Sequence, residues 1–494
     1  MKKTVFFVFI CLMILGILGS CDASSGSKGN GDGQKTGNNN PNDERILPDL
    51  PDADFENYEF TFLTHLCPND DWFSPEPREI VAEIESTADP INSAVYERND
   101  ILSRRYNITF KMVADENEHT VLSNLVNADD DIYDAVIIYN NNIQTVSSGN
   151  LLTNIENLKY VDLEKPWWDP AANSMSIDNK QFLLAGDMLI LDNEATNAMI
   201  FNKALMINNG LAFPYALVKE GKWTMDEMNR YVKDAAQDLD GDSKITPEED
   251  LWGFVCFRDT LHALLVSGGG TLALKDQDDL PYMNIMDPRN LAVIDKAMDI
   301  MYNKQDVMNI QVDTVMGTNT ENWLRVYHNV FQESRALFMW VRMRVVEKFR
   351  GMDAEFGIIP LPKYDELQEN YHSVVNPYTG VMLGVPRNVK NFDRTSIILE
   401  ALAAESRYTL QPAYYEVVLQ RKIARDSESQ EMLDIIFDSR VYDIGAIYGF
   451  GDAFIGFVGL CDKYDRNMTS FYDKRHGAME RAITKVVEAF SEME

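Results

Sequence analysis

Residues 135–139 have the sequence AVIIY, an apolar run without a break. Such a run is typical of a strand that is covered on both faces. Two earlier stretches, 58–62 (YEFTF) and 108–112 (ITFKM), alternate apolar and polar residues as half-buried strands do. Residues 95–106 (VYERNDILSRRY) lie between these two and have the pattern of a helix. Strands that alternate with helices predict an α/β fold with a largely parallel sheet.

The rest of the chain continues this pattern. Further strands are expected at 336–341, 356–359 and 381–385, and helices at 395–406, 429–437 and 479–490. About 440 residues follow position 52, too many for one hydrophobic core, so two lobes are expected.

One helix start is marked with particular clarity. Thr224 and Glu227 form a Thr-x-x-Glu capping box, and apolar residues recur behind it at helical spacing. We therefore expect a helix that packs one apolar face on a core. That face carries Met225, Met228, Tyr231, Val232 and Ala235.

The first twenty residues have the pattern of an export signal. Lys2 and Lys3 precede an apolar run at 5–18, which as a helix would be about 21 Å long, short of the ~30 Å bilayer core. The run ends in LGSC at 18–21, which resembles the bacterial lipobox. Residues 1–20 are therefore expected to be a lipoprotein signal peptide, with Cys21 as the lipidated residue. The alternative is a plain signal peptide with an unrelated cysteine.

Residues 21–52 are expected to be a flexible tether. Positions 24–42 are almost entirely Ser, Gly, Asn, Lys and Asp, without apolar residues to bury. A lipid on Cys21 would hold the protein at the extracytoplasmic face of the cell membrane. No later segment has 18 consecutive apolar residues, so no other membrane span is expected.

Charge and cysteine content limit the classes of partner. Asp and Glu number 78 against 45 Lys and Arg, a formal net charge of −33, which argues against nucleic acids and anionic lipids. The acidity can also serve only to keep an exported protein soluble. Beyond residue 21 the chain has only Cys67, Cys256 and Cys461, which are too few and uneven for a disulfide framework and are expected to be core thiols.

Several blocks in order resemble a known family. The first is FNKAL at 201–205, followed by Gly210-Leu211, Pro214 and GKWTMDE at 221–227. The others are ERN at 97–99, FGIIPLPKY at 356–364, LEALAAES at 399–406 and PAYY at 412–415. Together they resemble the family 1 extracellular solute-binding proteins, which include maltose-binding protein, and in particular a Gram-positive branch. Phe201 departs from the tyrosine that is usual in the first block.

The resemblance implies a class II periplasmic-binding-protein-like fold, with two discontinuous α/β lobes around a ligand cleft. Lobe 1 would span 53–190, lobe 2 would span 191–378, and residues 379–494 would return to lobe 1 with C-terminal helices that the two lobes can share. It also implies a monomeric receptor of an ABC importer, which closes on a solute and delivers it to a membrane permease. We expect the solute to be a carbohydrate, with a polyamine, a peptide or an amino acid as alternatives.

Candidate ligand contacts follow from the rule that ligands of such sheets bind outside the carboxyl ends of the strands. Tyr139, Asn140, Asn141 and Asn142 end and follow the AVIIY run. The resemblance also implies two crossings between the lobes, the first near 191–196 and the second near 376–379. The other candidates lie near these crossings or near other expected strand ends: Trp72, Asp192, Glu194, Asn197, Trp340, Arg342 and Tyr378. The asparagines can instead form a plain turn, and either tryptophan can pack in a core.

Residues 238–249 (DLDGDSKITPEE) match the spacing of a twelve-residue calcium loop. Its oxygen donors would be Asp238, Asp240, Asp242, the carbonyl of Lys244, Thr246 and Glu249. Ser243 stands where glycine is usual, and a left-handed conformation there costs about 1–2 kcal/mol. We expect a structural calcium ion, with an acidic turn without metal, or a calcium sensor, as alternatives.

Signals for catalysis are absent from the sequence. The six histidines do not have metal-ligand spacing, and no Gly-x-Ser-x-Gly nucleophile motif occurs. We therefore expect no catalytic residue and no organic cofactor. A secreted glycoside hydrolase and a surface adhesin remain alternatives from other classes.

Overall fold

A computed structural model describes residues 45–66, 77–82, 86, 88–243, 245–246, 249–310, 320–419 and 427–493. The fold lies in Ile46–Glu494, which form one unit. The expected signal peptide 1–20, Cys21, most of the tether, Trp72 and Lys244 lie outside the described residues.

The first sheet contains the strands that the sequence predicted in the N-terminal part. It consists of β1 (Tyr58–His65), β2 (Ile108–Asp115), β3 (Ala135–Tyr139) and β12 (Val381–Gly384) in the order β12-β3-β1-β2. The first three strands are parallel, and β12 is antiparallel to β3. All five residues of β3 are buried, as the AVIIY run predicted. Helix α1 (Pro90–Tyr106) connects β1 to β2, and α2 (Glu118–Ala128) connects β2 to β3.

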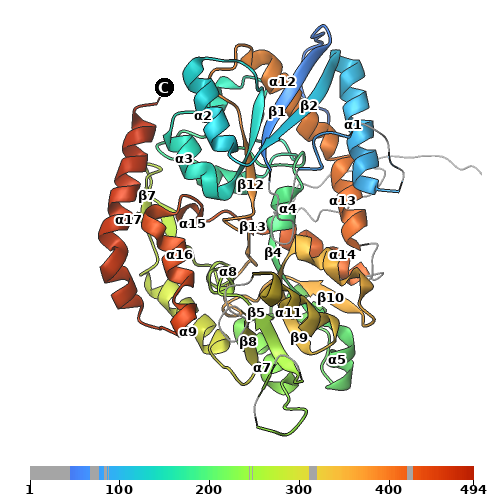
Figure 1. Cartoon of the computed structure of the whole chain (residues 1–494), viewed down its shortest axis with the longest axis vertical. Coiled ribbons are helices and arrows are strands. Elements are labelled where there is room, and N and C mark those ends of the chain that lie inside the picture. Colours follow the sequence, from blue (N-terminus) through green and yellow to red (C-terminus); the bar gives the residue numbers. More distant parts are fainter. Residues whose placement is uncertain are drawn as a thin grey trace, which may run out of the picture. The chain divides into compact units, whose positions relative to one another are not determined.

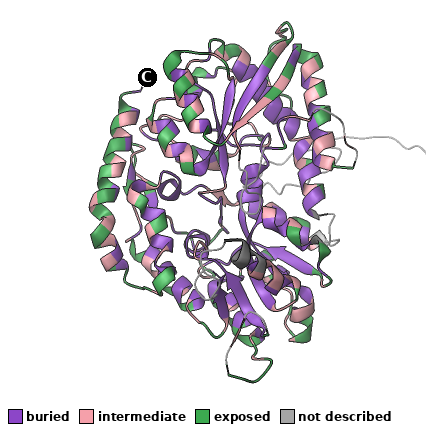
Figure 2. Ribbon diagram, in the orientation of Figure 1, coloured by how far each residue is buried: buried purple, intermediate pink, exposed green. Residues whose placement is uncertain are grey.

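The second sheet has five strands. They are β4 (Asn197–Asn202), β5 (Trp252–Cys256), β8 (Val307–Asn309), β9 (Ala336–Arg342) and β10 (Phe356–Ile359), in the order β10-β4-β9-β5-β8. Strands β5, β8 and β9 are parallel, whereas β4 is antiparallel to both of its neighbours. The two sheets are therefore mixed, each with one strand that reverses the parallel direction. Figure 2 shows the strands of both sheets as mostly buried, except β2, in which only Ile108 is buried.

The connecting elements surround these sheets (Figure 1). The α-helices are α3 (Ile143–Ser148), α4 (Leu191–Ala195), α5 (Lys203–Asn208), α6 (Tyr215–Lys219), α7 (Met225–Ala235), α8 (Thr260–Ser267), α9 (Pro288–Met301) and α11 (Thr320–Gln332). The 3-10 helices are η1 (Asn140–Asn142), η2 (Ile155–Asn157), η3 (Pro170–Met175), η4 (Met343–Gly351), η5 (Phe450–Asp452) and η6 (Cys461–Lys463). Strands β6 (Ala273–Lys275) and β7 (Pro281–Met283) form a separate hairpin. Among the described residues, no helix has the length and apolar character needed to cross a bilayer.

Helix α7 confirms the predicted helix start and its apolar face. The Thr224 hydroxyl accepts from the backbone N–H of Glu227 at 3.3 Å, and all five residues predicted to face the core are buried. The Glu227 carboxylate pairs with Arg230 at 2.5 Å. The capping residue thus satisfies one of the free N–H groups at the helix start.

Three segments lie side by side where the chain passes between the sheets. Thr196, just before β4, pairs with Val375 in an antiparallel bridge, and the N–H of Asn376 donates to the carbonyl of Ala195 at 3.0 Å. The N–H of Val375 donates to the carbonyl of Val441, also at 3.0 Å. The short strands β11 (Ser373–Val374) and β13 (Arg440–Val441) are parallel partners in the same region.

The helices after β12 contact elements of both sheets. They are α12 (Phe392–Ser406), α13 (Leu410–Leu419), α14 (Ser427–Asp438), α15 (Ile444–Ile447), α16 (Ala453–Val458) and α17 (Met468–Ser491). Helix α14 packs on β10, α16 on α8, and α17 on both α3 and β7. The helices predicted at 395–406, 429–437 and 479–490 correspond to α12, α14 and the C-terminal half of α17.

Candidate functional site

The carboxyl ends of β1, β2 and β3 carry a group of polar side chains. His65 is the last residue of β1, and Glu118 is the first residue of α2, just after β2. The Glu118 carboxylate has no exposed surface; it lies 2.7 Å from Nδ1 of His65 and accepts from Nδ2 of Asn142 at 2.6 Å. Glu118 therefore joins the loops that follow three neighbouring strands.

The three asparagines after β3 form the 3-10 turn η1 and have different environments. Asn140 is buried; its N–H donates to the carbonyl of Gly380 at 2.8 Å, and its Nδ2 donates to the carbonyl of Asn376 at 3.3 Å. A Cβ on Gly380 would lie 2.4 Å from that Nδ2, so glycine is required for this close approach. Asn141 is exposed, while Asn142 is held by Glu118. The triplet is thus a turn that also presents Asn141 to solvent.

Tyr139 and Arg342 bring the edges of the two sheets together. The Tyr139 ring meets the His65 ring edge to face, with centroids 4.8 Å apart. Burial lowers the pKa of the Arg342 guanidinium to about 10, while Asp259, Tyr327 and Tyr139 act in the opposite direction. Tyr139 is among the groups that raise the pKa of Arg342, so an electrostatic interaction links the end of β9 with the end of β3.

Groups of both charge signs gather around Arg342. Asp259 follows β5, and burial raises the pKa of its carboxyl, while Arg258, at 3.8 Å, and Arg342 lower it. Burial raises the pKa of the Tyr378 phenol to about 12, with Asp259 acting in the same direction. The Tyr378 ring lies edge-on to Phe454 at 5.1 Å. This side therefore offers charges of both signs, from Arg258, Arg342 and Asp259, and the phenol of Tyr378.

The carboxylates predicted near the first crossing have protein partners. Asp192 is fully buried and lies 3.3 Å from Nη1 of Arg440. Glu194 lies 2.7 Å from Nη2 of Arg78 and 3.7 Å from Nη1 of Arg344. Burial raises the pKa of Asp192 to about 7, although Arg440 opposes this shift. Both carboxylates thus belong to ion pairs beside the crossing.

Two further predicted contacts lie in the protein interior. Trp340 is 2% exposed, and its ring lies 5.8 Å from that of Phe257 in the core around the second sheet. Asn197 is also 2% exposed and pairs with Arg342 across β4 and β9. The structure therefore brings Tyr139, the asparagines, Arg342 and Tyr378 to the strand ends. Tyr139 and Arg342 are nearly as buried there as Trp340 and Asp192, whereas Asn141 is exposed.

Sequence reasoning missed four groups at these strand ends: His65, Glu118, Arg258 and Asp259. His65 could have been found by extending the first predicted strand beyond 58–62, because Leu63 and Thr64 continue that strand to His65. Arg258 and Asp259 follow β5, a strand whose end was not predicted. Glu118 has no local signal, because its role depends on partners from two other loops.

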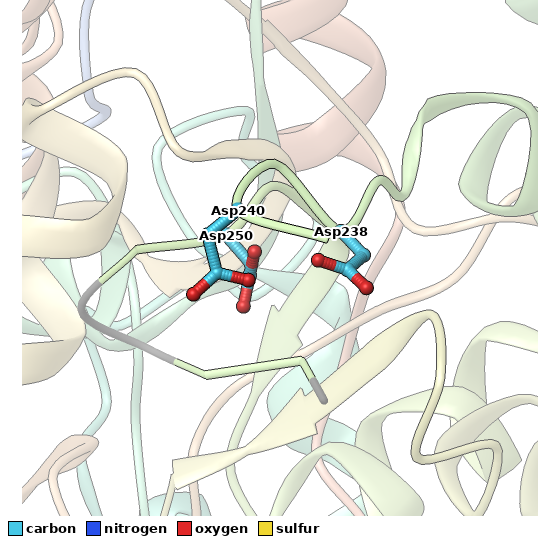
Figure 3. Close-up of side chains that lie close together, drawn as sticks. All are labelled: Asp238, Asp240 and Asp250. Carbon is cyan, nitrogen blue, oxygen red and sulfur yellow. The ribbon is translucent and has the colours of Figure 1, made fainter. Parts of the chain in front are cut away.

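The acidic loop brings together a slightly different set of carboxylates from the one predicted (Figure 3). Oxygens of Asp238, Asp240 and Asp250 lie within 4.8 Å of one another. Asp250 is buried and accepts from the N–H groups of Leu239 at 2.8 Å and Thr246 at 2.6 Å. Glu249 is exposed, and contact with the Asp240 carboxyl raises its pKa.

The backbone of this loop turns as the spacing predicted. Ser243, at the position where glycine is usual, has a φ of 68°, in the left-handed region. The Asp238 carboxylate accepts from the N–H groups of Gly241 at 2.7 Å and Ser243 at 2.8 Å. Asp238 thus holds the turn from within the loop.

Two surface grooves lie away from the strand ends. One, of about 640 Å³, lies between α9 and the start of α17, and includes Ile294, Met298 and Met468. The other, of about 600 Å³, lies between residues 154–163 and 176–181, beside Asp279. Neither groove contains a predicted ligand contact.

Comparison with known proteins finds the same fold at low sequence identity. No protein-family model and no curated protein match the sequence. Among solved structures, M. tuberculosis UspC has a TM-score of 0.55 at 13% identity, covering 87% of this chain and 100% of its own. The ABC substrate-binding protein Lmo0181 from Listeria monocytogenes, in complex with cycloalternan, has a TM-score of 0.51 at 11% identity, covering 89% and 100%.

A third similar structure is the maltose/maltodextrin-binding domain MalE from Bdellovibrio bacteriovorus bound to maltotriose. It has a TM-score of 0.50 at 12% identity and covers 88% of this chain and all of its own. Full coverage of each neighbour confirms the fold that the resemblance in sequence implied. The chain therefore has the class II periplasmic-binding-protein-like α/β fold that these solute-binding proteins share.

Proposed function

We propose that this protein is the extracytoplasmic receptor of an ABC importer and that it binds a neutral oligosaccharide between the two sheets. The observation that carries the proposal is the electrostatic interaction that links Tyr139, at the end of β3, with Arg342, at the end of β9, together with the contact of the His65 and Tyr139 rings. Two proteins of the same fold have oligosaccharides bound, cycloalternan in one and maltotriose in the other. A lipid on Cys21 would hold the receptor at the membrane, next to its permease.

The chemistry of these strand ends suits a sugar. Sugars offer apolar C–H faces, which pack on aromatic rings, and hydroxyl rims, which need neutral donors and acceptors. Tyr378 supplies a half-buried ring, and Asn141 supplies an exposed amide. Arg342 and Asp259 carry opposite charges and interact with each other. A neutral ligand would not disturb this pairing.

Binding would be coupled to a hinge motion of the two lobes. The segments around Thr196, Val375 and Val441 join the sheets, so bending there would move Arg342 relative to Tyr139. A ligand that contacts both strand edges would favour the closed arrangement through its extra contacts. No reacting group is needed for this function, and we propose a binding protein and not an enzyme.

A polyamine is the rival solute. Its positive charges would require several carboxylates that are free to bind it. Asp192 and Glu194 are the carboxylates that sequence offered for it. Asp192 pairs with Arg440, and Glu194 pairs with Arg78, so binding a polyamine there would have to break ion pairs of low exposure. This argument favours the sugar.

Calorimetry with the mature protein tests the proposal, using maltotriose and cycloalternan against spermidine and a tripeptide. We expect saturable binding of a sugar that weakens about tenfold or more, or 1.4 kcal/mol, in Asn141→Ala. Asn127→Ala, an exposed asparagine near the other end of α2, is the matched control and should bind as wild type does. Tight spermidine binding that is lost in Asp192→Asn and unchanged in Asn141→Ala would refute the sugar assignment.

We also propose that the acidic loop binds a structural calcium ion. Asp238, Asp240 and Asp250 offer carboxylate oxygens close together, and calcium needs six to eight oxygen ligands. Asp242, Thr246, Glu249 and the carbonyl of Lys244 could supply the others. The raised pKa of Glu249 beside Asp240 is consistent with crowded negative charge that a cation would relieve.

A further inference from the structure

Three loops of the first sheet meet at one buried carboxylate, that of Glu118. His65 comes from the end of β1, Glu118 from the start of α2, and Asn142 from the turn after β3. Oε2 of Glu118 lies 2.7 Å from Nδ1 of His65, and Oε1 accepts from Nδ2 of Asn142 at 2.6 Å. The Glu118 side chain is fully buried, whereas 21% of the His65 side chain is exposed.

We propose that Glu118 is a positioning residue that makes His65 and Asn142 present hydrogen-bond acceptors to the solute. This edge of the site would therefore recognise hydroxyl donors of a neutral sugar. The inference rests on the proposed function and adds His65 as a solute contact. Glu118 acts through its two partners and does not itself touch the solute.

The argument follows from what a carboxylate can do. An ionised carboxylate only accepts hydrogen bonds, so Nδ1 of His65 must carry the proton of that contact. In the neutral ring, Nε2 is then an acceptor. Asn142 uses its Nδ2 group on Glu118, which leaves its Oδ1 as the outward acceptor. Neither His65 Nε2 nor Asn142 Oδ1 has a hydrogen-bond partner within the part of the chain that the structure describes.

The position of Glu118 explains how a buried carboxylate is tolerated. Burying a charge is costly unless it is hydrogen-bonded, and Glu118 has two such bonds. It is also the first residue of α2, where the helix dipole favours negative charge. A glutamine there would offer one acceptor and one donor group. One of the two partners would then have to reverse its orientation.

The consequence for the solute is a preference in chemistry. Two outward acceptors match the O–H groups of a neutral sugar. A carboxylate or phosphate has no hydrogen to donate there when ionised, and it would lie near the negative charge of Glu118. The buried Tyr139 ring packs edge to face against His65 at the same edge. Neutral oligosaccharides should therefore bind more tightly than acidic ones.

The neighbouring His119 provides a matched control. Its Nδ1 lies 3.8 Å from the same Glu118 oxygen, too far for a hydrogen bond. A change at His119 thus alters a histidine near the carboxylate without removing a partner of it. His65→Phe keeps an aromatic ring against Tyr139 but removes both ring nitrogens.

The test combines nitrogen NMR with calorimetry on the mature protein, with maltotriose and cycloalternan as probes. In wild type, ¹⁵N shifts of His65 should report the tautomer with hydrogen on Nδ1, and Nε2 should shift when the tighter-binding sugar is added. In Glu118→Gln the tautomer should become mixed. Kd for that sugar should rise about tenfold or more in Glu118→Gln and His65→Phe, and should stay within about twofold in His119→Gln.

Two results would overturn the inference while leaving the proposed function intact. One is a wild-type His65 that carries its hydrogen on Nε2, a result that needs no variant to fold. The other is unchanged sugar affinity in a folded His65→Phe protein. If wild type binds neither sugar, the proposed function fails and the inference falls with it.

Discussion

Replacing Glu400 with glutamine should change how the stability of the protein depends on pH. Glu400 lies in α12, is 1% exposed, and accepts from the indole N–H groups of Trp167 at 3.0 Å and Trp168 at 2.7 Å. Burial raises the pKa of its carboxyl from 4.5 to about 7, although these two hydrogen bonds lower it. The folded protein therefore holds the Glu400 proton more tightly than the unfolded chain.

The sign and size of the effect follow from this difference. Between pH 4.5 and about 7 the folded state binds more protons at this site, so the free energy of unfolding falls as pH rises. The full loss is about 3 kcal/mol, at 1.36 kcal/mol for each pH unit. The stabilising contribution is complete below pH 4.5 and absent above pH 7. Glu400→Gln mimics the neutral acid and removes this dependence.

Equilibrium urea unfolding at several pH values between 4.5 and 8 measures the effect. Fluorescence of Trp167 and Trp168 reports the surroundings of the substituted residue directly. The free energy of unfolding of Glu400→Gln minus that of wild type should increase by about 3 kcal/mol between pH 4.5 and pH 8. Glutamine keeps only one of the two acceptor oxygens, so one indole N–H loses its partner. This adds a penalty of about 1–3 kcal/mol that does not depend on pH.

An exposed glutamate gives the control. Glu156→Gln should change the free energy of unfolding by less than about 0.5 kcal/mol at every pH. A difference between Glu400→Gln and wild type that stays constant within about 0.5 kcal/mol from pH 4.5 to 8 would refute the reasoning. It would mean that the pKa of the Glu400 carboxyl does not differ between the folded and unfolded states in this pH range.

Three further predictions concern the anchor, the acidic loop and a helix cap. Cys21→Ala should release protein into the medium or leave an unprocessed precursor, because two acyl chains are needed for stable attachment; normal processing with membrane fractionation like wild type would contradict this. Chelator should lower the melting temperature of calcium-loaded wild type but not of Asp240→Ala, since an ion bound only to the folded state at a hundredfold excess over Kd adds about 2.7 kcal/mol. Equal melting curves of calcium-loaded and metal-free wild type would exclude the ion. Thr224→Ala should cost about 1 kcal/mol in urea unfolding and Thr224→Ser much less, because serine keeps the hydroxyl that accepts from Glu227; equal losses in both would contradict the capping role.

Local pattern was enough to predict most elements of the fold. The apolar run of β3 and the cap and apolar face of α7 are each decided within a few neighbouring residues, and the structure confirms them. The positive φ of Ser243 also follows from the spacing of the acidic loop alone. These features depend on interactions between residues that are close in sequence, or on burial that the sequence pattern itself records.

The candidate site was predictable only in part. The strand-end rule led to Tyr139 and Arg342, which an electrostatic interaction links in the structure. The same rule could not distinguish Asn141, which is exposed, from Asn140, which is committed to Gly380 and Asn376. Trp340 also follows the rule, yet its ring packs in the core, because β9 is covered on both faces and all seven of its residues are buried.

The sequence by itself determined the alternation of strands and helices, the cap of α7, and the turn of the acidic loop. Only the tertiary structure decided which polar groups are available, because availability depends on partners that are distant in the chain. Asp192 is neutralised by Arg440, 248 positions away, and Glu118 meets His65 and Asn142 from two other loops. Local spacing carries no information on such pairings, since they arise when packing of the sheets brings separate strand ends together.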